Sequence, residues 1–274
     1  MKRIIAVNSN CYHGFPIEEA LERIAAAGFR AVELTATKGW TEHVFPTMPF
    51  RSLLTIKQQI KQLGLQVVAM SGHTNLMDAA RLDDFVANIH LAHFMEAPII
   101  VTSVGEAHLS DEEVSSDEVV VKHVHQLIPL LESLDMMLVI ENHGEHGSGH
   151  RIRQIIDKVD HPRVKLNYDT ANAVFYGDLD VVDDFVESLA DIAYIHLKDK
   201  AGAKREWNFP ALSQGDLPLG KLLSILEESA NPSPLSLEIE FTTAGASSID
   251  EVDQALRISR DYLISLGYEG FNHD

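Results

Sequence analysis

The sequence contains one cysteine, Cys11, in 274 residues. A single thiol cannot form a disulfide within the chain, which excludes a small scaffold held together by internal disulfides. No apolar run approaches the ~18 residues of a membrane-spanning helix. The opening stretch, MKRIIAVNSN, has too few apolar residues for a signal peptide, whose apolar core has ~7–15. We therefore expect a cytoplasmic protein that does not contact a membrane.

Positive charge is also scarce. The chain has 22 Lys and Arg against 41 Asp and Glu, which gives a formal net charge of -19 at pH 7. This charge repels the phosphates of nucleic acids, and no stripe of Lys and Arg opposes it locally. We therefore expect no nucleic-acid partner. The glycine-rich motif GxGxxG and the P-loop motif are absent as well, so a nucleotide-binding fold is not indicated.

Short apolar segments alternate with longer amphipathic segments along the whole chain. The apolar segments are typical of strands, and the others are bounded by helix signals, such as Pro16 at one start and Gly28 at the corresponding end. We expect eight strands, at residues 3–10, 30–35, 66–73, 98–104, 136–143, 164–170, 192–199 and 234–241. One helix should follow each strand, with helix starts near Ser115, after Ser148 and at Ser248.

Strict alternation of this kind predicts a parallel sheet, and eight units predict closure into a (β/α)8 TIM barrel. Such a barrel typically needs ~250 residues, so a single domain accounts for residues 1–274. Each predicted strand is apolar at its amino end and polar at its carboxyl end. This polarity is expected of a barrel whose active face lies at the carboxyl ends of its strands.

Four consecutive strands in the second half end in a residue that can bind a metal ion: Glu141, Asp169, His196 and Glu238. One carboxylate at a strand end is commonly structural, but four in succession are not. Side chains at the carboxyl ends of neighbouring barrel strands converge on one mouth. Alternation along each strand allows all four to point inward. Three carboxylates and one imidazole suit a divalent cation, and the pattern therefore predicts a metalloenzyme.

A run of histidines after the fifth strand offers an alternative metal site. His143, His146 and His150 are three ligands of the kind that zinc prefers. We assign His143 to substrate binding instead, because it lies two residues beyond Glu141 and on the same face of the strand. His146 and His150 are interpreted as loop residues.

Lys198 stands in the same relation to His196. It can anchor an anionic end of the substrate or form a salt bridge with Asp199 or Glu240, and the sequence favours neither. Residues 200–207 form a long loop that can close over a substrate. The aromatic residues able to form an apolar wall at the mouth are Trp40, Phe45 and Trp207.

Six phrases of the sequence resemble one known family: GFRAVEL, VIENHG, NYDTANA, YIHLKDK, SQGDLPLGKLLSIL and PLSLEIEF. They are similar to the sugar phosphate isomerase/epimerase family, which has the xylose isomerase-like TIM barrel, and the resemblance covers nearly the whole chain. The superfamily also contains ketose 3-epimerases, hydroxypyruvate isomerases, inosose dehydratases and DNA-repair enzymes of the endonuclease IV type. The resemblance therefore specifies the metal-binding frame more closely than the substrate.

The resemblance implies one divalent metal ion (Mn, Mg, Co or Zn) on Glu141, Asp169, His196 and Glu238. The residues expected to contact a small carbohydrate substrate are His73, His143, Asn172, Lys198 and Glu240. In the ketohexose epimerases of this family, a histidine and an arginine that hold the substrate stand where this chain has Asn172 and Gly202, which argues against a plain ketohexose. His73 and His108 match part of the set with which the endonuclease relatives bind three zinc ions.

Such a site catalyses proton transfer beside a carbonyl, because a divalent cation stabilises the enediolate that forms. We expect Glu141 and Glu238 to be the catalytic acid and base. Proton return to the same carbon gives epimerisation, return to the adjacent carbon gives aldose–ketose isomerisation, and loss of a β-hydroxyl gives dehydration. The favoured function is a metal-dependent epimerase or isomerase of a small sugar, sugar phosphate or sugar acid.

The alternative is a metal-dependent dehydratase of a cyclic polyol ketone or hydroxyketone, because the same four ligands permit that reaction. An endonuclease IV-like phosphodiesterase and a non-catalytic barrel have less support. The negative net charge disfavours the nuclease. Intact Glu141 and Glu238 disfavour the loss of catalysis. A homo-oligomer is possible.

Overall fold

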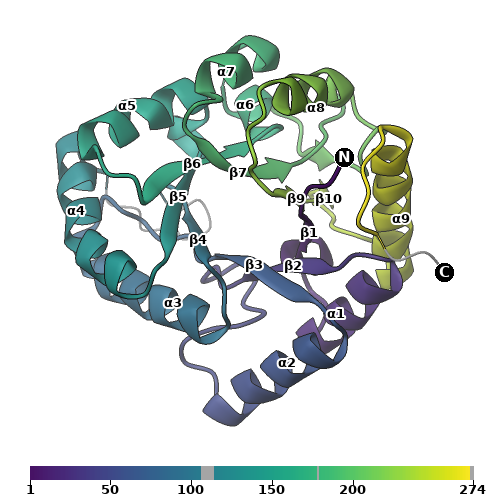
Figure 1. Ribbon diagram of the computed structural model, residues 1–274, viewed down its shortest axis with the longest axis horizontal. Coiled ribbons are helices and arrows are strands. Elements are labelled where there is room, and N and C mark those ends of the chain that lie inside the picture. The colour runs from purple at the N-terminus through teal and green to yellow at the C-terminus, as the bar shows by residue number, and fades with distance from the viewer. Residues whose placement is uncertain (106–113, 178, 272–274) are drawn as a thin grey trace.

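Eight parallel strands lie at the centre of the molecule and close on themselves (Figure 1). They are β1 (Ile5–Asn8), β2 (Ala31–Thr35), β3 (Gln66–Ser71), β4 (Ile99–Thr102), β5 (Met137–Glu141), β6 (Val164–Asp169), β7 (Ile192–Leu197) and β9 (Leu235–Leu237). Each pairs with the next, and β9 pairs with both β7 and β1, which completes the barrel. The computed structural model describes residues 1–105, 114–177 and 179–271. The predicted TIM barrel is confirmed.

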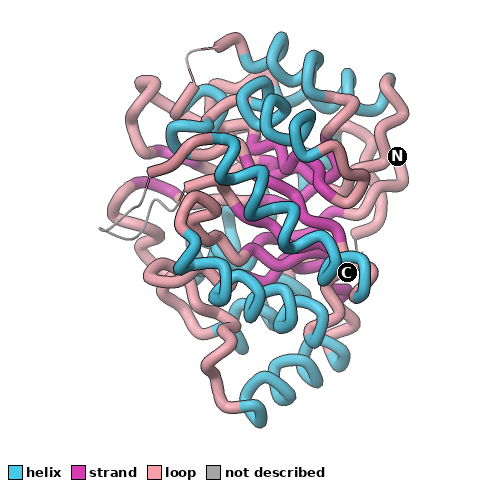
Figure 2. The backbone as a smooth tube through the Cα atoms, turned by 90° about the vertical axis from the view of Figure 1, so that its left-hand side faces the viewer, coloured by secondary structure: helices cyan, strands magenta, loops and turns pink. Residues whose placement is uncertain are grey.

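Helices surround the barrel as an outer ring, so that the strands lie between them in the side view (Figure 2). They are α1 (Ile17–Ala26), α2 (Phe50–Gln62), α3 (Leu82–Phe94), α4 (Asp117–Ser133), α5 (Gly149–Val159), α6 (Asn172–Phe175), α7 (Val181–Ser188), α8 (Leu219–Glu228) and α9 (Ile249–Ser265). Ser148 and Ser248 accept backbone hydrogen bonds at the starts of α5 and α9, as the sequence predicts. The N-cap of α4 is Ser116, one residue later than predicted. Among the described residues, no helix is both long and apolar enough to cross a bilayer.

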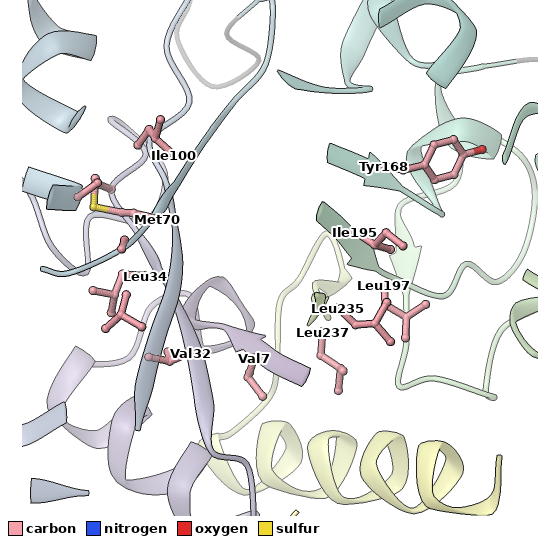
Figure 3. Close-up of a cluster of buried hydrophobic side chains, with 14 of the residues drawn as sticks. Val7, Val32, Leu34, Met70, Ile100, Tyr168, Ile195, Leu197, Leu235 and Leu237 are labelled. Carbon is pink, nitrogen blue, oxygen red and sulfur yellow. The ribbon is translucent and has the colours of Figure 1, made fainter. Parts of the chain in front are cut away.

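The core has two apolar layers, one on each side of the strands. Outward-facing residues such as Ile140, Tyr168 and Ile195 pack between the strands and the helices, and Figure 3 shows part of this layer. A smaller inner layer fills the barrel and includes Val139 and Tyr194. Val139 and Ile140 therefore point to opposite sides of the strand, as the alternation predicts. This register turns the polar strand ends toward the mouth.

The chain leaves the barrel earlier than predicted after β9. The sequence predicts a strand through Phe241, but β9 ends at Leu237. The N–H of Glu238 still donates to the carbonyl oxygen of Leu197. β7 ends level with β9 and β1 ends one residue later, so the backbone groups beyond Glu238 have no strand partner in the barrel. They bond to the preceding loop instead, where β10 (Phe241–Thr242) pairs antiparallel with β8 (Asn208–Phe209). This two-stranded sheet, which the sequence does not signal, joins two loops of the mouth.

His43 holds two further loops of the mouth together. Its Nε2 lies 3.0 Å from the carbonyl oxygen of Phe15, and the residue is buried. Burial lowers the pKa of His43 to about 4. In the unfolded chain the His43 imidazole is protonated near pH 6.5, whereas in the folded protein it is protonated only at lower pH. The stability from neutral His43 is therefore present above pH ~6.5 and declines as the pH falls toward about 4.

We expect His43→Gln to remove this part of the pH dependence. Between pH 7 and pH 4.5 the wild type should lose about 2 kcal/mol more free energy of unfolding than the variant. Urea unfolding at the two pH values measures the difference. His90→Gln, at an exposed position of α3, is the control and should keep the wild-type response. Equal losses in His43→Gln and wild type would contradict the prediction.

Candidate metal centre

The four side chains predicted to bind a metal meet at the carboxyl end of the barrel. Glu141 ends β5, Asp169 ends β6, His196 is the penultimate residue of β7, and Glu238 directly follows β9. Their ligand atoms all lie within 4.8 Å of one another. All four residues are buried. The structure therefore gathers the whole predicted set from four neighbouring strands at one point.

Two buried atoms of this cluster have no hydrogen-bond partner among the described residues. They are Oδ2 of Asp169 and Nδ1 of His196. The Nδ1 atom lies 3.4 Å from Oε2 of Glu141 and 3.4 Å from Oε2 of Glu238 without forming a hydrogen bond to either. A buried polar atom without a partner costs about 1–3 kcal/mol. A divalent cation coordinated by these atoms would remove that cost, and the donor set fits one.

Glu33 on β2 sets the orientation of His196. Its carboxylate is fully buried and lies 3.0 Å from Nε2 of His196 and 3.1 Å from the Tyr194 hydroxyl, and the Ser71 hydroxyl also donates to it. Because Nε2 donates its proton to Glu33, Nδ1 faces the cluster and would offer its lone pair to a bound cation. The sequence marks Glu33 only as a polar strand end. Its partner stands on β7, which is not a neighbour of β2 in the barrel, so no strand pattern connects the two.

Burial and crowding decide the charges of the cluster. Burial raises the pKa of Asp169 to about 7, while the charge of Lys198 opposes the rise. Burial also opposes ionisation of Glu141, but the neighbouring His196 and His73 hold the pKa of its carboxyl well below the usual range. The cluster is therefore negatively charged and still short of cations. A divalent ion at its centre would balance that charge.

Lys198 is the cation inside this cluster. Burial acts against its charge, but three carboxylates raise its pKa well above the ordinary value. Its Nζ lies 2.5 Å from Glu240, 3.2 Å from Glu238 and 3.7 Å from Asp169. Of the alternatives that the sequence leaves open, the salt bridge with Glu240 is therefore present. Asp199 is engaged elsewhere, because it accepts hydrogen bonds from backbone N–H groups of the following loop.

The other predicted substrate contacts surround Glu141. His73 Nε2 lies 2.8 Å from one carboxylate oxygen, and Asn172 Nδ2 donates to the other at 2.8 Å. His143 packs on Tyr176, with ring centroids 4.9 Å apart. Burial lowers the pKa of His143 to about 4, so its ring is neutral at pH 7. All three residues line the cleft above the cluster, where they can reach a bound molecule.

Two asparagines that the sequence analysis leaves unassigned complete the site. Asn8 and Asn10 each donate to Oε1 of Glu238 at 3.2 Å, and Asn10 also donates to Glu240 at 3.0 Å. In the sequence, the only feature that indicates these two asparagines is the polar carboxyl end of the first strand, NSN. We call the whole hollow the inner cleft; its lining is Asn8, Asn10, Thr35, Thr37, Trp40, Ser71, His73, Ser103, Glu141, His143, Asn172, Tyr176, Lys198, Trp207, Phe209, Glu238 and Glu240.

The alternative histidine sites do not form in the part of the chain that the structure describes. His146 contacts Arg151, and His150 contacts Gln154 on α5. Neither lines the inner cleft. His146 lies in the connection between β5 and α5, as interpreted from the sequence, whereas His150 lies in the first turn of α5 and is not a loop residue. His108, the second histidine matched to the endonuclease set, lies outside the described residues.

Comparison with known proteins places this geometry in one family. The model of the xylose isomerase-like TIM barrel family matches residues 21–263. A search of curated proteins finds no match. Among solved structures, an L-ribulose 3-epimerase is similar, with a TM-score of 0.77 at 15% identity, over 97% of this chain and 94% of that one.

Two other solved structures are comparably similar. A xylose isomerase-like TIM barrel protein from Mycobacterium smegmatis, in complex with magnesium, has a TM-score of 0.75 at 15% identity and covers 96% of each chain. The apo form of a 3-keto-D-glucoside 4-epimerase from E. coli has a TM-score of 0.72 at 15% identity, over 96% of this chain and 99% of that one. At these identities the structural likeness shows the shared fold.

We expect Glu33→Gln to weaken divalent-ion binding by about 10- to 100-fold, because the amide no longer holds His196 as the carboxylate does. Isothermal titration with Mn²⁺ and Mg²⁺ measures the affinity. Glu19→Gln, an exposed change of the same kind on α1, should bind as the wild type does. Unchanged affinity in Glu33→Gln, with one ion per chain, would show that Glu33 does not position the ligand.

Proposed function

Because this chain belongs to the xylose isomerase-like TIM barrel family, we propose that it is a metal-dependent epimerase or isomerase of a small carbohydrate. The observation that carries the proposal is the pair of buried carboxylates Glu141 and Glu238. Glu141 ends β5 and Glu238 follows β9, strands that are not neighbours in the barrel, yet both side chains reach the same cluster. Two carboxylates placed in this way can remove a proton from one side of a bound molecule and return it from the other.

The surroundings of the two glutamates suit proton transfer. His73 and Asn172 hold the two oxygens of Glu141, and Asn8 and Asn10 hold one oxygen of Glu238. Both carboxylates are therefore oriented before a substrate binds, which lowers the entropy cost of the reaction. A divalent ion on the four ligands would supply electrophilic catalysis, since it withdraws electrons from a carbonyl and acidifies the neighbouring C–H.

Proton balance fixes the possible products. Glu141 accepts the proton of a carbon beside the carbonyl, and Glu238, which must enter this step protonated by solvent, gives that proton to the opposite face of the same carbon, which inverts that centre. Return of the proton from Glu141 to solvent completes the cycle. Donation to the adjacent carbon instead converts a ketose to an aldose. Lys198 and His143 lie where they can hydrogen-bond to sugar hydroxyls. The names of two similar structures, an L-ribulose 3-epimerase and a 3-keto-D-glucoside 4-epimerase, support carbohydrate as the substrate class.

The structure of the seventh loop bears on which carbohydrate is bound. Gly202, at the position where the ketohexose epimerases have arginine, has a φ of +74°, and an added Cβ would lie 2.4 Å from Oε2 of Glu206. Its N–H donates to Asp216 at 3.2 Å. The positive φ disfavours any residue other than glycine here, so this loop is built around a glycine where the arginine clamp would stand. The substrate we propose is a hydroxyketone sugar other than the common free ketohexoses.

We expect Glu141→Gln and Glu238→Gln each to lower turnover by ~10²–10⁴-fold, because the amide can neither accept nor donate the proton. Incorporation of deuterium from D2O into a panel of keto sugars and keto glycosides, followed by NMR with saturating Mn²⁺, measures the loss. The position of the label and the product distinguish epimerisation, isomerisation and dehydration.

Glu240→Gln is the matched control for these variants. It makes the same change two residues beyond Glu238, on a side chain that we assign to substrate binding. It should raise KM more than it lowers kcat. Metal titration of all three variants separates loss of the ion from loss of the proton carrier. Near-normal exchange in Glu141→Gln or Glu238→Gln would contradict the proposed chemistry.

A further inference from the structure

A second hollow, which we call the outer hollow, lies next to the inner cleft and is continuous with it. The two share the residues Asn10, Trp40, Tyr176, Trp207 and Glu240. The rest of the outer hollow is formed mainly by residues 239–246, which follow the ligand Glu238 in the chain. A molecule held at the four ligands therefore has a direct path into the outer hollow.

One wall of the outer hollow is aromatic. His13 stacks on Trp40 with ring centroids 4.3 Å apart and planes at 16°. Trp207 meets Trp40 edge to face, with centroids 6.3 Å apart. These three residues come from loops after three different strands, β1, β2 and β7. Rings brought together from separate loops form an angled aromatic wall, and the face of such a ring is the kind of surface on which the C–H face of a sugar ring packs.

A second part of the lining, residues 239–246, is mainly apolar, carries the hydroxyls of Thr242 and Thr243, and is fixed in place. Backbone pairing of Phe241 with Phe209 ties it to the loop that carries Trp207. Phe241 has a φ of +59°, an uncommon conformation for a bulky residue, and this marks a sharp turn at the start of this segment. Beyond it, Thr242 offers a hydroxyl, and Ala244 and Gly245 leave open space. Hydroxyls opposite an aromatic face suit a ligand that has both an apolar face and a polar rim.

Charge decides against a phosphate in either hollow. Among the described residues that line them, Lys198 is the only Lys or Arg. Lys198 already neutralises carboxylates of Glu238 and Glu240, at 3.2 and 2.5 Å. The outer hollow itself contains the carboxyl group of Glu240. Away from the metal ligands, a phosphate would meet the carboxyl group of Glu240 and no uncommitted Lys or Arg among the described lining residues, which favours a neutral ligand.

We infer that the outer hollow is a second sugar-ring subsite and that the substrate is a neutral glycoside of at least two rings. This inference rests on the proposed function for the reacting ring at the metal centre. The second ring packs against Trp40 and Trp207, and its hydroxyls face Thr242 and Glu240. The subsite makes the enzyme selective for glycosides over free monosaccharides and over sugar phosphates.

The test compares the affinity of the protein for sugars of one ring and of two rings, measured without turnover. Isothermal titration and saturation-transfer NMR with Mn²⁺-loaded protein use methyl β-glucoside, glucose 6-phosphate, cellobiose and maltose as probes. We expect the better disaccharide to bind about tenfold tighter than the methyl glucoside, a gain of the size of one or two aromatic contacts. The phosphate should bind no better than the methyl glucoside.

Two variants locate the second ring. Trp207→Ala removes part of the aromatic wall, and Ala244→Trp fills the hollow from an exposed position without removing any contact. Both should abolish the advantage of the disaccharide. Ala244→Trp, which lies outside the inner cleft, should leave binding of the methyl glucoside unchanged, whereas Trp207→Ala also removes a residue of the inner cleft and should weaken the methyl glucoside less than the disaccharide. Phe50→Ala, an exposed aromatic residue outside both hollows, is the control and should bind all probes as the wild type does.

The outcomes separate the two proposals. Disaccharides that bind no tighter than the methyl glucoside, or an Ala244→Trp variant that weakens one-ring and two-ring probes equally, would overturn the second subsite. Tighter binding of glucose 6-phosphate would overturn the assignment of a neutral ligand. Failure of the proposed function would appear instead as absent deuterium exchange with every sugar, while the binding preference for two rings persists.

Discussion

Mutual repulsion among buried carboxylates is the constraint on which the mouth of this barrel depends. Glu141, Asp169 and Glu238 converge within a few ångströms, away from water, where like charges repel strongly. Lys198 and His196 offset part of this charge. Two ligand atoms nevertheless remain without hydrogen bonds. Such an arrangement is costly for folding and is retained where an ion is to be bound, because the protein cannot satisfy these atoms with its own donors.

The barrel offsets this cost by holding the side chains of the cluster in place with hydrogen bonds. Glu33 holds the ring of His196, two asparagines hold Glu238, and Asn172 with His73 holds Glu141. These supports come from the ends of four strands or the loops after them, β1, β2, β3 and β6, so their positions are fixed by the closed sheet. The inner layer of small and aromatic residues, among them Tyr194, then fills the space beneath. Rigidity at the mouth follows from closure of the barrel.

Strand ends and their spacing were enough to predict the barrel and the convergence of the four ligands, because both follow from the period of two and from parallel pairing. The role of Glu33 could not be predicted in the same way, since its contact with His196 joins strands that are not adjacent. The pairing of β8 with β10 was missed for a related reason: it depends on where β1 and β7 end, which leaves later backbone groups without barrel partners. Contacts within one strand–helix unit or between neighbouring strands can be predicted from a sequence. Contacts across the barrel depend on how the sheet closes in three dimensions.

The pairing that the sequence does not reveal is also what shapes the entrance. Because β10 is tied to β8, the segment after Glu238 turns away from the barrel and stands opposite Trp40 and Trp207. The same few residues thus carry a candidate metal ligand, a partner of Lys198 and part of the outer hollow. In the proposed function, chemistry at the floor of the cleft uses charge, and selection at the entrance uses aromatic surface and hydroxyls. A substrate of such an enzyme must satisfy both together, so a metal-binding arrangement shared across a family leaves the identity of the substrate to the loops above it.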